Sequence, residues 1–152
     1  MGGEGGAREL RIAVVNGPNL NLLGTREPEL YGTRTLGELE ALCREHAGRL
    51  GCELTFFQAN SEGALIDHLQ SEGRQAGGVI LNPAALTHYS YALLDCVRAL
   101  SVPVVEVHLS NLYARPEPWR RVSVTAPAAR GIISGLGFRG YLLAMEFLLG
   151  ND

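Results

Sequence analysis

Glu106 and His108 are the side chains of this sequence best suited to acid–base chemistry, because they lie two residues apart in an apolar run. The run, Val104–Leu109, is typical of a buried strand, and side chains at positions i and i+2 of a strand point to the same face. A carboxylate beside an imidazole can fix the tautomer of the ring and favours its protonated, acid form. The pair therefore predicts a general acid, with a structural ion pair at a strand end as the alternative.

A second polar group lies in the long segment Asn16–Gly32, which follows an apolar, β-branched run over Leu10–Val15. The Asn-Gly-Pro sequence at its start breaks the strand, because proline lacks an N–H and restricts the residue before it. The next helical pattern begins only near Leu36, and loops of this length in compact domains are usually lids, binding loops or disordered. A catalytic lid that carries Arg26 and Tyr31 and an ordinary surface loop both remain open.

Two further segments are typical of anion binding. Asn82–Ser90 runs from a predicted strand end into a helix start, where free N–H groups attract anions, and Leu109–Ser110 offers a backbone and a hydroxyl after another strand. Turn formation by Asn82 and helix capping by Ser90 would explain the same residues. A metal site made of His88, Glu106 and His108 is also conceivable. The surrounding asparagines and arginines, however, suit an anionic organic ligand better than a cation.

Apolar periodicity predicts the elements that must position these side chains. The predicted strands cover residues 10–15, 52–57, 78–82, 104–109 and the surroundings of 132–133, and the predicted helices cover 36–50, 61–70, 90–100 and 136–149. Alternating apolar strands and helices indicate an α/β fold with a parallel sheet covered on both faces. Five strands fit the small doubly wound, flavodoxin-like order 2-1-3-4-5, in which the ends of strands one, three and four meet at the ligand-binding crevice.

Length and composition exclude several classes of protein. The 152 residues suit one domain, expected over residues 10–152 after a disordered tail at 1–9, and the formal net charge of −3 argues against nucleic-acid or membrane-surface partners. No apolar run reaches membrane length. Three cysteines without metal-ligand spacing predict reduced thiols in a cytoplasmic protein. The G-x-G-x-x-G pattern at Gly135–Gly140 comes too near the end of the sequence for a dinucleotide fold and more plausibly allows close strand–helix packing.

From about Arg11 to Leu149, the chain resembles the type II 3-dehydroquinate dehydratases, small flavodoxin-like enzymes of aromatic biosynthesis. The resemblance rests on a set of motifs that is specific only when taken together. These motifs are NGPNLNLLGTREPELYG at 16–32, LNP at 81–83, TH at 87–88, EVHLSN at 106–111 and GLGFRGY at 135–141.

The resemblance implies a dehydration of 3-dehydroquinate to 3-dehydroshikimate without metal, cofactor or Schiff base. Tyr31 would take a C2 proton, Arg26 would support it, and Asn19 would help to hold a water that stabilises the enolate. His108, oriented by Glu106, would protonate the departing C1 hydroxyl. Ionising an ordinary tyrosine at neutral pH costs roughly 4 kcal/mol, and a cation about 4 Å away at an effective dielectric near 20 supplies a similar amount. A base on this loop is therefore expected to have Arg26 beside it.

The resemblance also implies the substrate contacts and the assembly. Asn82 and the Leu109–Ser110 backbone would hold the carboxylate, and His88 and an arginine would hold the hydroxyls. That arginine is expected to be Arg120, which follows an aromatic residue, with Arg121 as the alternative. Asp95 would reach the active site of a neighbouring subunit, within trimers that assemble as a homo-dodecamer. Because Asp95 lies off the apolar stripe of its predicted helix, we expect it to face outward from its own subunit.

Some positions depart from the pattern of the family. Family members usually have glycine near Ala84, an aromatic residue near Leu86, threonine near Tyr89 and histidine before the serine at position 123, and the run 115–121 is one residue longer here. Two rival functions therefore stay open. One is a flavodoxin-like binding module for a small anion, and the other is a catalytically weakened homologue kept as an oligomeric scaffold.

Overall fold

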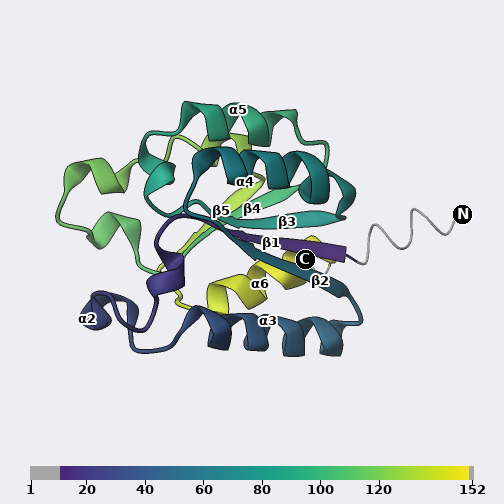
Figure 1. Ribbon diagram of the computed structural model, residues 1–152, viewed down its shortest axis with the longest axis horizontal. Helices are drawn as coiled ribbons and strands as arrows, with labels where there is room; N and C mark the ends of the chain where they lie inside the picture. Colours follow the sequence, from purple (N-terminus) through teal and green to yellow (C-terminus); the bar gives the residue numbers. More distant parts are fainter. Residues whose placement is uncertain (1–10, 151–152) are drawn as a thin grey trace, which may run out of the picture.

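The computed structural model describes residues 11–150, which form a five-stranded parallel sheet with helices on both faces (Figure 1). The strand order is β2-β1-β3-β4-β5. The strands are β1 (Arg11–Asn16), β2 (Glu53–Gln58), β3 (Gly78–Asn82), β4 (Val104–His108) and β5 (Gly131–Ser134). The predicted flavodoxin-like order is thus confirmed. The predicted disordered tail at 1–9 lies outside the described residues.

Four longer helices cover the sheet, two on each face (Figure 1). They are α3 (Leu36–Leu50), α4 (Glu62–His68), α5 (Tyr91–Ala99) and α6 (Arg139–Leu148). One apolar cluster lies between the sheet and α3 with α6, and a second lies under α4 and α5. Side chains at Thr35, Ser61 and Ser90 cap the first turns of α3, α4 and α5 by accepting a backbone N–H three residues on. Within residues 11–150, no helix is long and apolar enough to cross a membrane.

The last helix begins later than predicted, at Arg139 instead of Leu136. Gly135 and Gly137 have φ angles of 95° and 60°, which glycine adopts easily and which are incompatible with a right-handed helix. Gly140 does serve close packing, because an added Cβ would lie 3.2 Å from Ile133 and 3.3 Å from Val107. The helix predicted over 61–70 ends earlier than expected, at His68, and the chain continues as a π-helical turn over Leu69–Gly73.

The segment after β1 is more ordered than its sequence indicates. We call residues 16–32 the lid segment. It contains a short turn over Leu20–Leu22 and a single-turn helix, α2 (Pro28–Tyr31). Proline at the first position of α2 suits a helix start, since its missing N–H would have no partner there. Tyr31 therefore sits on a helical turn, where an irregular loop was expected.

The register of the sheet brings the polar strand ends together. Asn16 at the end of β1 pairs with Asn82 at the end of β3, and Glu106 of β4 pairs with Leu81. Gly17 continues β1 so close to β3 that a Cβ there would lie 2.6 Å from the carbonyl oxygen of Pro83. Only glycine fits this approach, which fixes where the lid segment leaves the sheet.

Candidate active site

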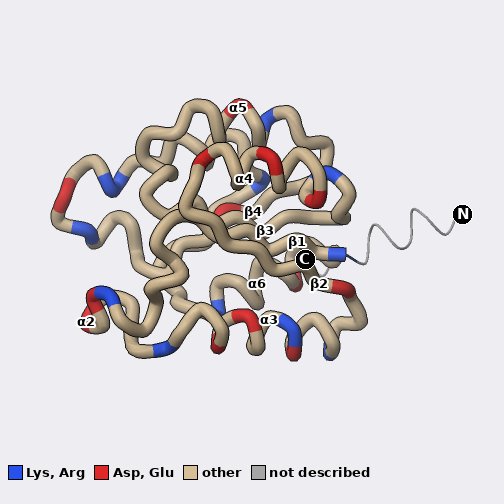
Figure 2. Tube along the Cα trace, viewed as in Figure 1, with Lys and Arg blue, Asp and Glu red and all other residues tan. Residues whose placement is uncertain are grey.

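A cavity of about 150 Å³ lies at the carboxyl ends of β1, β3 and β4. The lid segment lines one side of it and residues 108–120 line another, and both segments carry arginines (Figure 2). Most of the residues predicted for the site line this cavity. They are Asn19, Arg26, Tyr31, Asn82, His88, His108, Leu109, Ser110 and Arg120. Glu106 lies behind His108, and Asp95 lies elsewhere.

His108 and Glu106 form the predicted pair, with 2.7 Å between His108 Nε2 and Glu106 Oε2. Both side chains are buried. Glu106 also accepts hydrogen bonds from the hydroxyls of Ser123 and Thr125. An ionised carboxylate is an acceptor only, so His108 Nε2 donates to it. The Nδ1 atom is then the ring nitrogen left to serve a ligand in the cavity.

Tyr31 is the other candidate for acid–base chemistry in the cavity, and two arginines approach it. Its hydroxyl oxygen lies 3.1 Å from Nη1 of Arg115, which donates to it. The guanidinium carbon of Arg26 lies 4.9 Å from the centre of the phenol ring, and its Nη2 is 3.4 Å from Glu27. Arg26 is therefore beside the ring as expected, but Arg115 makes the contact with the oxygen atom.

Arg115 is the cavity residue that sequence reasoning missed. Its side chain is only 7% exposed, and its Nη1 also donates to Ser110 Oγ at 3.1 Å. Arg121 in turn donates from Nε to the Arg115 carbonyl oxygen at 2.9 Å. Arginine is rarely buried without partners, so its burial reflects these hydrogen bonds. The sequence signal for Arg115 was a basic residue at the start of a proline-rich stretch, and this pattern is equally typical of a solvated loop.

Asn82 lines the cavity, and its side chain also forms hydrogen bonds with two other residues of the protein. Its Oδ1 accepts the backbone N–H of Ala84 at 3.1 Å, and its Nδ2 donates to the hydroxyl of Tyr141 at 2.9 Å. Tyr141 donates onward to Asn16 Oδ1 at 2.7 Å, and burial raises the pKa of Tyr141, which keeps this phenol protonated. One amide hydrogen of Asn82 remains for a ligand.

His88 is held by the backbone of a neighbouring loop. Its Nδ1 lies 2.7 Å from the carbonyl oxygen of Val122, which can only accept, so Nδ1 carries the hydrogen. Burial lowers the pKa of His88, the hydrogen bond to Val122 opposes this, and the charges of His108 and Arg120 add to the lowering. A neutral ring with Nδ1 protonated has Nε2 free to accept a hydrogen bond from a ligand hydroxyl.

The structure places Arg120, and not Arg121, at the cavity. The guanidinium carbon of Arg120 lies 4.3 Å from the centre of the Trp119 ring, and its Nε is 2.9 Å from Glu117 Oε2. These neighbours hold the arginine against the mouth of the cavity. Arg121 is exposed and directed to the Arg115 backbone.

Asn19 and Asp95 occupy contrasting places. Asn19 lines the cavity with a φ of 71°, a left-handed conformation that asparagine tolerates better than most residues, and its N–H donates to Asn60 at 3.0 Å. Asp95 is exposed on α5, which confirms its predicted outward direction, and it does not line the cavity of its own chain.

The alternative metal site finds no support in the geometry. Among residues 11–150, no three histidine, cysteine, aspartate or glutamate side chains are arranged to hold a metal ion.

A phenol held by arginines and an imidazole held by a carboxylate, at the switch point of a doubly wound sheet, define an enzyme that moves protons on a small anionic substrate. Residues 10–149 match the family Dehydroquinase class II. The chain belongs to this family.

Relatives and solved structures agree with this assignment. The chain is 57% identical to a 3-dehydroquinate dehydratase of Roseiflexus castenholzii, over 93% of this chain and 90% of that protein. It is 58% identical to a 3-dehydroquinate dehydratase of Thermus thermophilus, over 90% of this chain and 92% of that one. A crystal structure of a type II dehydroquinase from Butyrivibrio crossotus superimposes with a TM-score of 0.89 at 40% identity, over 94% of this chain and 98% of that one.

Proposed function

We propose that the chain dehydrates 3-dehydroquinate to 3-dehydroshikimate by anti elimination through an enolate, as a step of the shikimate pathway of aromatic amino-acid biosynthesis. The observation that carries the proposal is the placement of Tyr31 and His108 in one cavity, each held by a charged partner. A base and an acid are both needed, because the reaction removes a proton from C2 and a hydroxide from C1.

Tyr31 acts as the base in this proposal. Ionised Tyr31 accepts the C2 proton next to the ketone, and Arg115 and Arg26 stabilise its negative charge before the transfer. The enolate that results is stabilised by a water molecule that Asn19 helps to hold. His108 then gives a proton to the C1 hydroxyl, which leaves as water, and the double bond forms between C1 and C2. Glu106 fixes the histidine for this step.

The substrate contacts follow from the free donors and acceptors of the cavity. The remaining amide hydrogen of Asn82 and the backbone at Leu109–Ser110 bind the carboxylate. Arg120 and the Nε2 atom of His88 bind the ring hydroxyls. The sequence contains thirteen arginines and no lysine, so no lysine side chain is available to form an imine with the ketone. Elimination through an enolate is therefore the route that these residues support.

A binding module without chemistry is less consistent with this cavity. Binding an anion requires cations and N–H donors but gives no reason to hold an imidazole against a buried carboxylate. A catalytically weakened homologue would keep the same architecture, and only a measured turnover separates it from an active enzyme.

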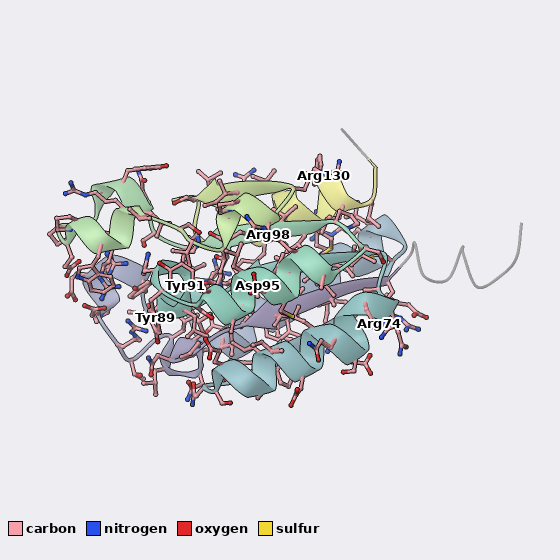
Figure 3. All side chains as sticks on the ribbon, turned by 90° about the horizontal axis from the view of Figure 1, so that it is seen from above. Arg74, Tyr89, Tyr91, Asp95, Arg98 and Arg130 are labelled. Carbon is pink, nitrogen blue, oxygen red and sulfur yellow. The ribbon has the colours of Figure 1, made fainter. Side chains whose placement is uncertain are left out.

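We further propose that the protein works as a dodecamer built from trimers. Tyr91, which is 68% exposed, lies with Asp95 on the outer side of α5, and Tyr89, which is 61% exposed, lies just before this helix (Figure 3). Tyrosine is enriched at protein–protein interfaces, so this side of α5 suits a contact between subunits. A three-fold ring joins two different faces, so α5 of one subunit would place Asp95 at the cavity mouth of the next. Tyr113, which is 76% exposed, lies in the segment after β4 and offers such a second face.

A cytoplasmic location is the remaining part of the proposal. Cys43, Cys52 and Cys96 are all free, and Cys43 and Cys96 are buried. Burial raises the pKa of the Cys43 thiol to about 12, so this thiol stays protonated and unreactive. Unpaired cysteines of this kind are usual in a reducing compartment.

Incubating the purified protein with 3-dehydroquinate and recording the absorbance of the conjugated enone product tests the activity directly. We expect product to accumulate without added metal, cofactor or reductant, and we expect Tyr31→Phe to remove the signal while leaving the far-ultraviolet circular dichroism unchanged. Absence of product from the parental protein, assembled and folded, would refute the proposed activity and favour the scaffold alternative.

A further inference from the structure

The loop of residues 122–125 contacts His88 of the cavity and the Glu106 carboxylate that binds His108. The Val122 carbonyl accepts a hydrogen bond from His88 Nδ1 at 2.7 Å, and the Val124 N–H donates to the Thr87 carbonyl at 2.8 Å. These two contacts fix the backbone of the loop beside the end of β3. The side chains of Ser123 and Thr125, which lie on either side of Val124, point to the carboxylate behind His108.

Two hydroxyl groups hold that carboxylate, one on each oxygen. Thr125 Oγ1 donates to Glu106 Oε1, and Ser123 Oγ donates to Glu106 Oε2 at 2.8 Å. Ser123 Oγ also accepts the Ala126 N–H at 2.9 Å, which directs its single hydrogen toward the carboxylate. Thr125 is 1% exposed, so no bulk water is available there to replace its hydroxyl.

We infer that Ser123 and Thr125 are positioning residues for the general acid, which hold the Glu106 carboxylate in the plane that keeps Oε2 on His108 Nε2. The inference rests on the proposed function of His108. The terminal torsion of a glutamate is broad, so a carboxylate without these donors can rotate. Rotation would move Oε2 of Glu106 away from the His108 ring. His108 Nε2 would then lose the acceptor that keeps a hydrogen on Nε2. The same acceptor holds the ring with Nδ1 facing the cavity.

Threonine-to-valine replacements test this with a matched control in the same region. Thr125→Val keeps the shape of the side chain and removes its hydroxyl. Thr87→Val makes the same change at a buried threonine whose Oγ1 has no hydrogen-bond partner among residues 11–150. Because a displaced catalytic group costs on the order of a hundredfold in rate, we expect Thr125→Val to lower kcat about tenfold to a hundredfold with KM changed less than about twofold. Thr125→Ser should restore kcat to within about threefold, and Thr87→Val should leave it unchanged.

Nitrogen-15 NMR of the labelled histidine rings gives a readout that does not need turnover. The parental protein should show a hydrogen on His108 Nε2 whether the ring is neutral or protonated, and Thr125→Val combined with Ser123→Ala should give a neutral ring that is a mixture of the two tautomers. Thr87→Val should keep the parental spectrum. A combined variant that retains both the parental tautomer and a kcat within twofold of the parent would overturn the inference. A parental protein without turnover would instead contradict the proposed function, and the tautomer comparison alone would then decide the role of the two hydroxyls.

Discussion

Tyr31 meets two arginines in different ways, and the difference matters for its chemistry. Arg115 donates to the phenol oxygen from 3.1 Å, whereas Arg26 lies over the ring at 4.9 Å from its centre. Negative charge on a phenolate is largest at the oxygen, so a donor in direct contact stabilises it through a charge-assisted hydrogen bond as well as through its field. Arg26 adds a second positive charge that is partly balanced by Glu27.

Replacing Arg115 by glutamine is therefore expected to reduce turnover strongly. The loss of a contact cation of this kind, worth up to about 4 kcal/mol at an effective dielectric near 20, should lower kcat on the order of a hundredfold or more. Arg121→Gln, which removes the exposed neighbour that binds the Arg115 carbonyl, is the control and should change kcat by less than about threefold. Steady-state kinetics with 3-dehydroquinate, accompanied by thermal melts, makes the comparison. Equal kcat values for the two variants would mean that Arg115 does not support the base.

At the scale of elements, the turn after β3 carries an unfavourable backbone conformation. Ala84 has a φ of 55°, in the left-handed region that costs a residue with a Cβ roughly 1–2 kcal/mol. The turn persists because Asn82 Oδ1 accepts the Ala84 N–H and because the chain must bend here to line the cavity. The family usually has glycine near this position, so the chain folds despite the missing glycine.

We expect Ala84→Gly to stabilise the protein. Relief of the left-handed conformation outweighs the extra entropy of an unfolded glycine, roughly 0.5–1 kcal/mol, and leaves a net gain of about 0.5–1 kcal/mol. Ala85→Gly, one residue on at an ordinary negative φ, should lower stability by about the same amount. Urea unfolding of both variants measures the two changes. Destabilisation of the same size by both would show that the conformation of Ala84 carries no strain.

Much of this architecture could be predicted from the sequence, because apolar runs and capping residues act locally. The alternation of strands and helices gave the sheet order, and helix α3 has the predicted bounds 36–50 with Gly51 as its stop. The convergence of Asn82 and His108 followed from the fold alone. The late start of α6 could not be seen, since it depends on the positive φ angles of Gly135 and Gly137 and not on apolar spacing.

The parts of the site that could not be predicted from the sequence depend on contacts between distant segments. Arg115 reaches Tyr31 across 84 positions of sequence, and Tyr141 links Asn16 and Asn82 from the last helix. No local pattern marks such partners, and each of these side chains has an ordinary structural explanation. The pair of Glu106 and His108 could be predicted because the spacing of the two residues on one strand determines their geometry.

At the scale of the whole molecule, the proposed trimer couples assembly to activity. If Asp95 serves the cavity of a neighbouring subunit, Asp95→Ala should weaken substrate binding about tenfold or more without dissociating the oligomer. Asp95 is exposed and makes no ion pair with another residue of 11–150, so its removal should cost the isolated subunit little stability. Substrate titration and light scattering measure the two effects.

Subunit mixing makes this test specific. Refolding an excess of Asp95→Ala subunits with Tyr31→Phe subunits should restore part of the activity, because some cavities then receive Tyr31 and Asp95 from different chains. Asp95→Ala subunits refolded alone are the control, and their activity should not increase. A fully active monomer in light scattering would contradict the shared site.

The division of labour between Tyr31 and His108 is the central claim, and hydrogen exchange in heavy water tests it most directly. Tyr31→Phe and His108→Ala proteins are each incubated with 3-dehydroquinate in D₂O, and substrate and product are followed by proton NMR. With the base present and the acid removed, His108→Ala should exchange a C2 hydrogen of the substrate for deuterium while forming almost no 3-dehydroshikimate. Tyr31→Phe should neither exchange nor eliminate. Exchange or product formation by Tyr31→Phe at the parental rate would contradict the account.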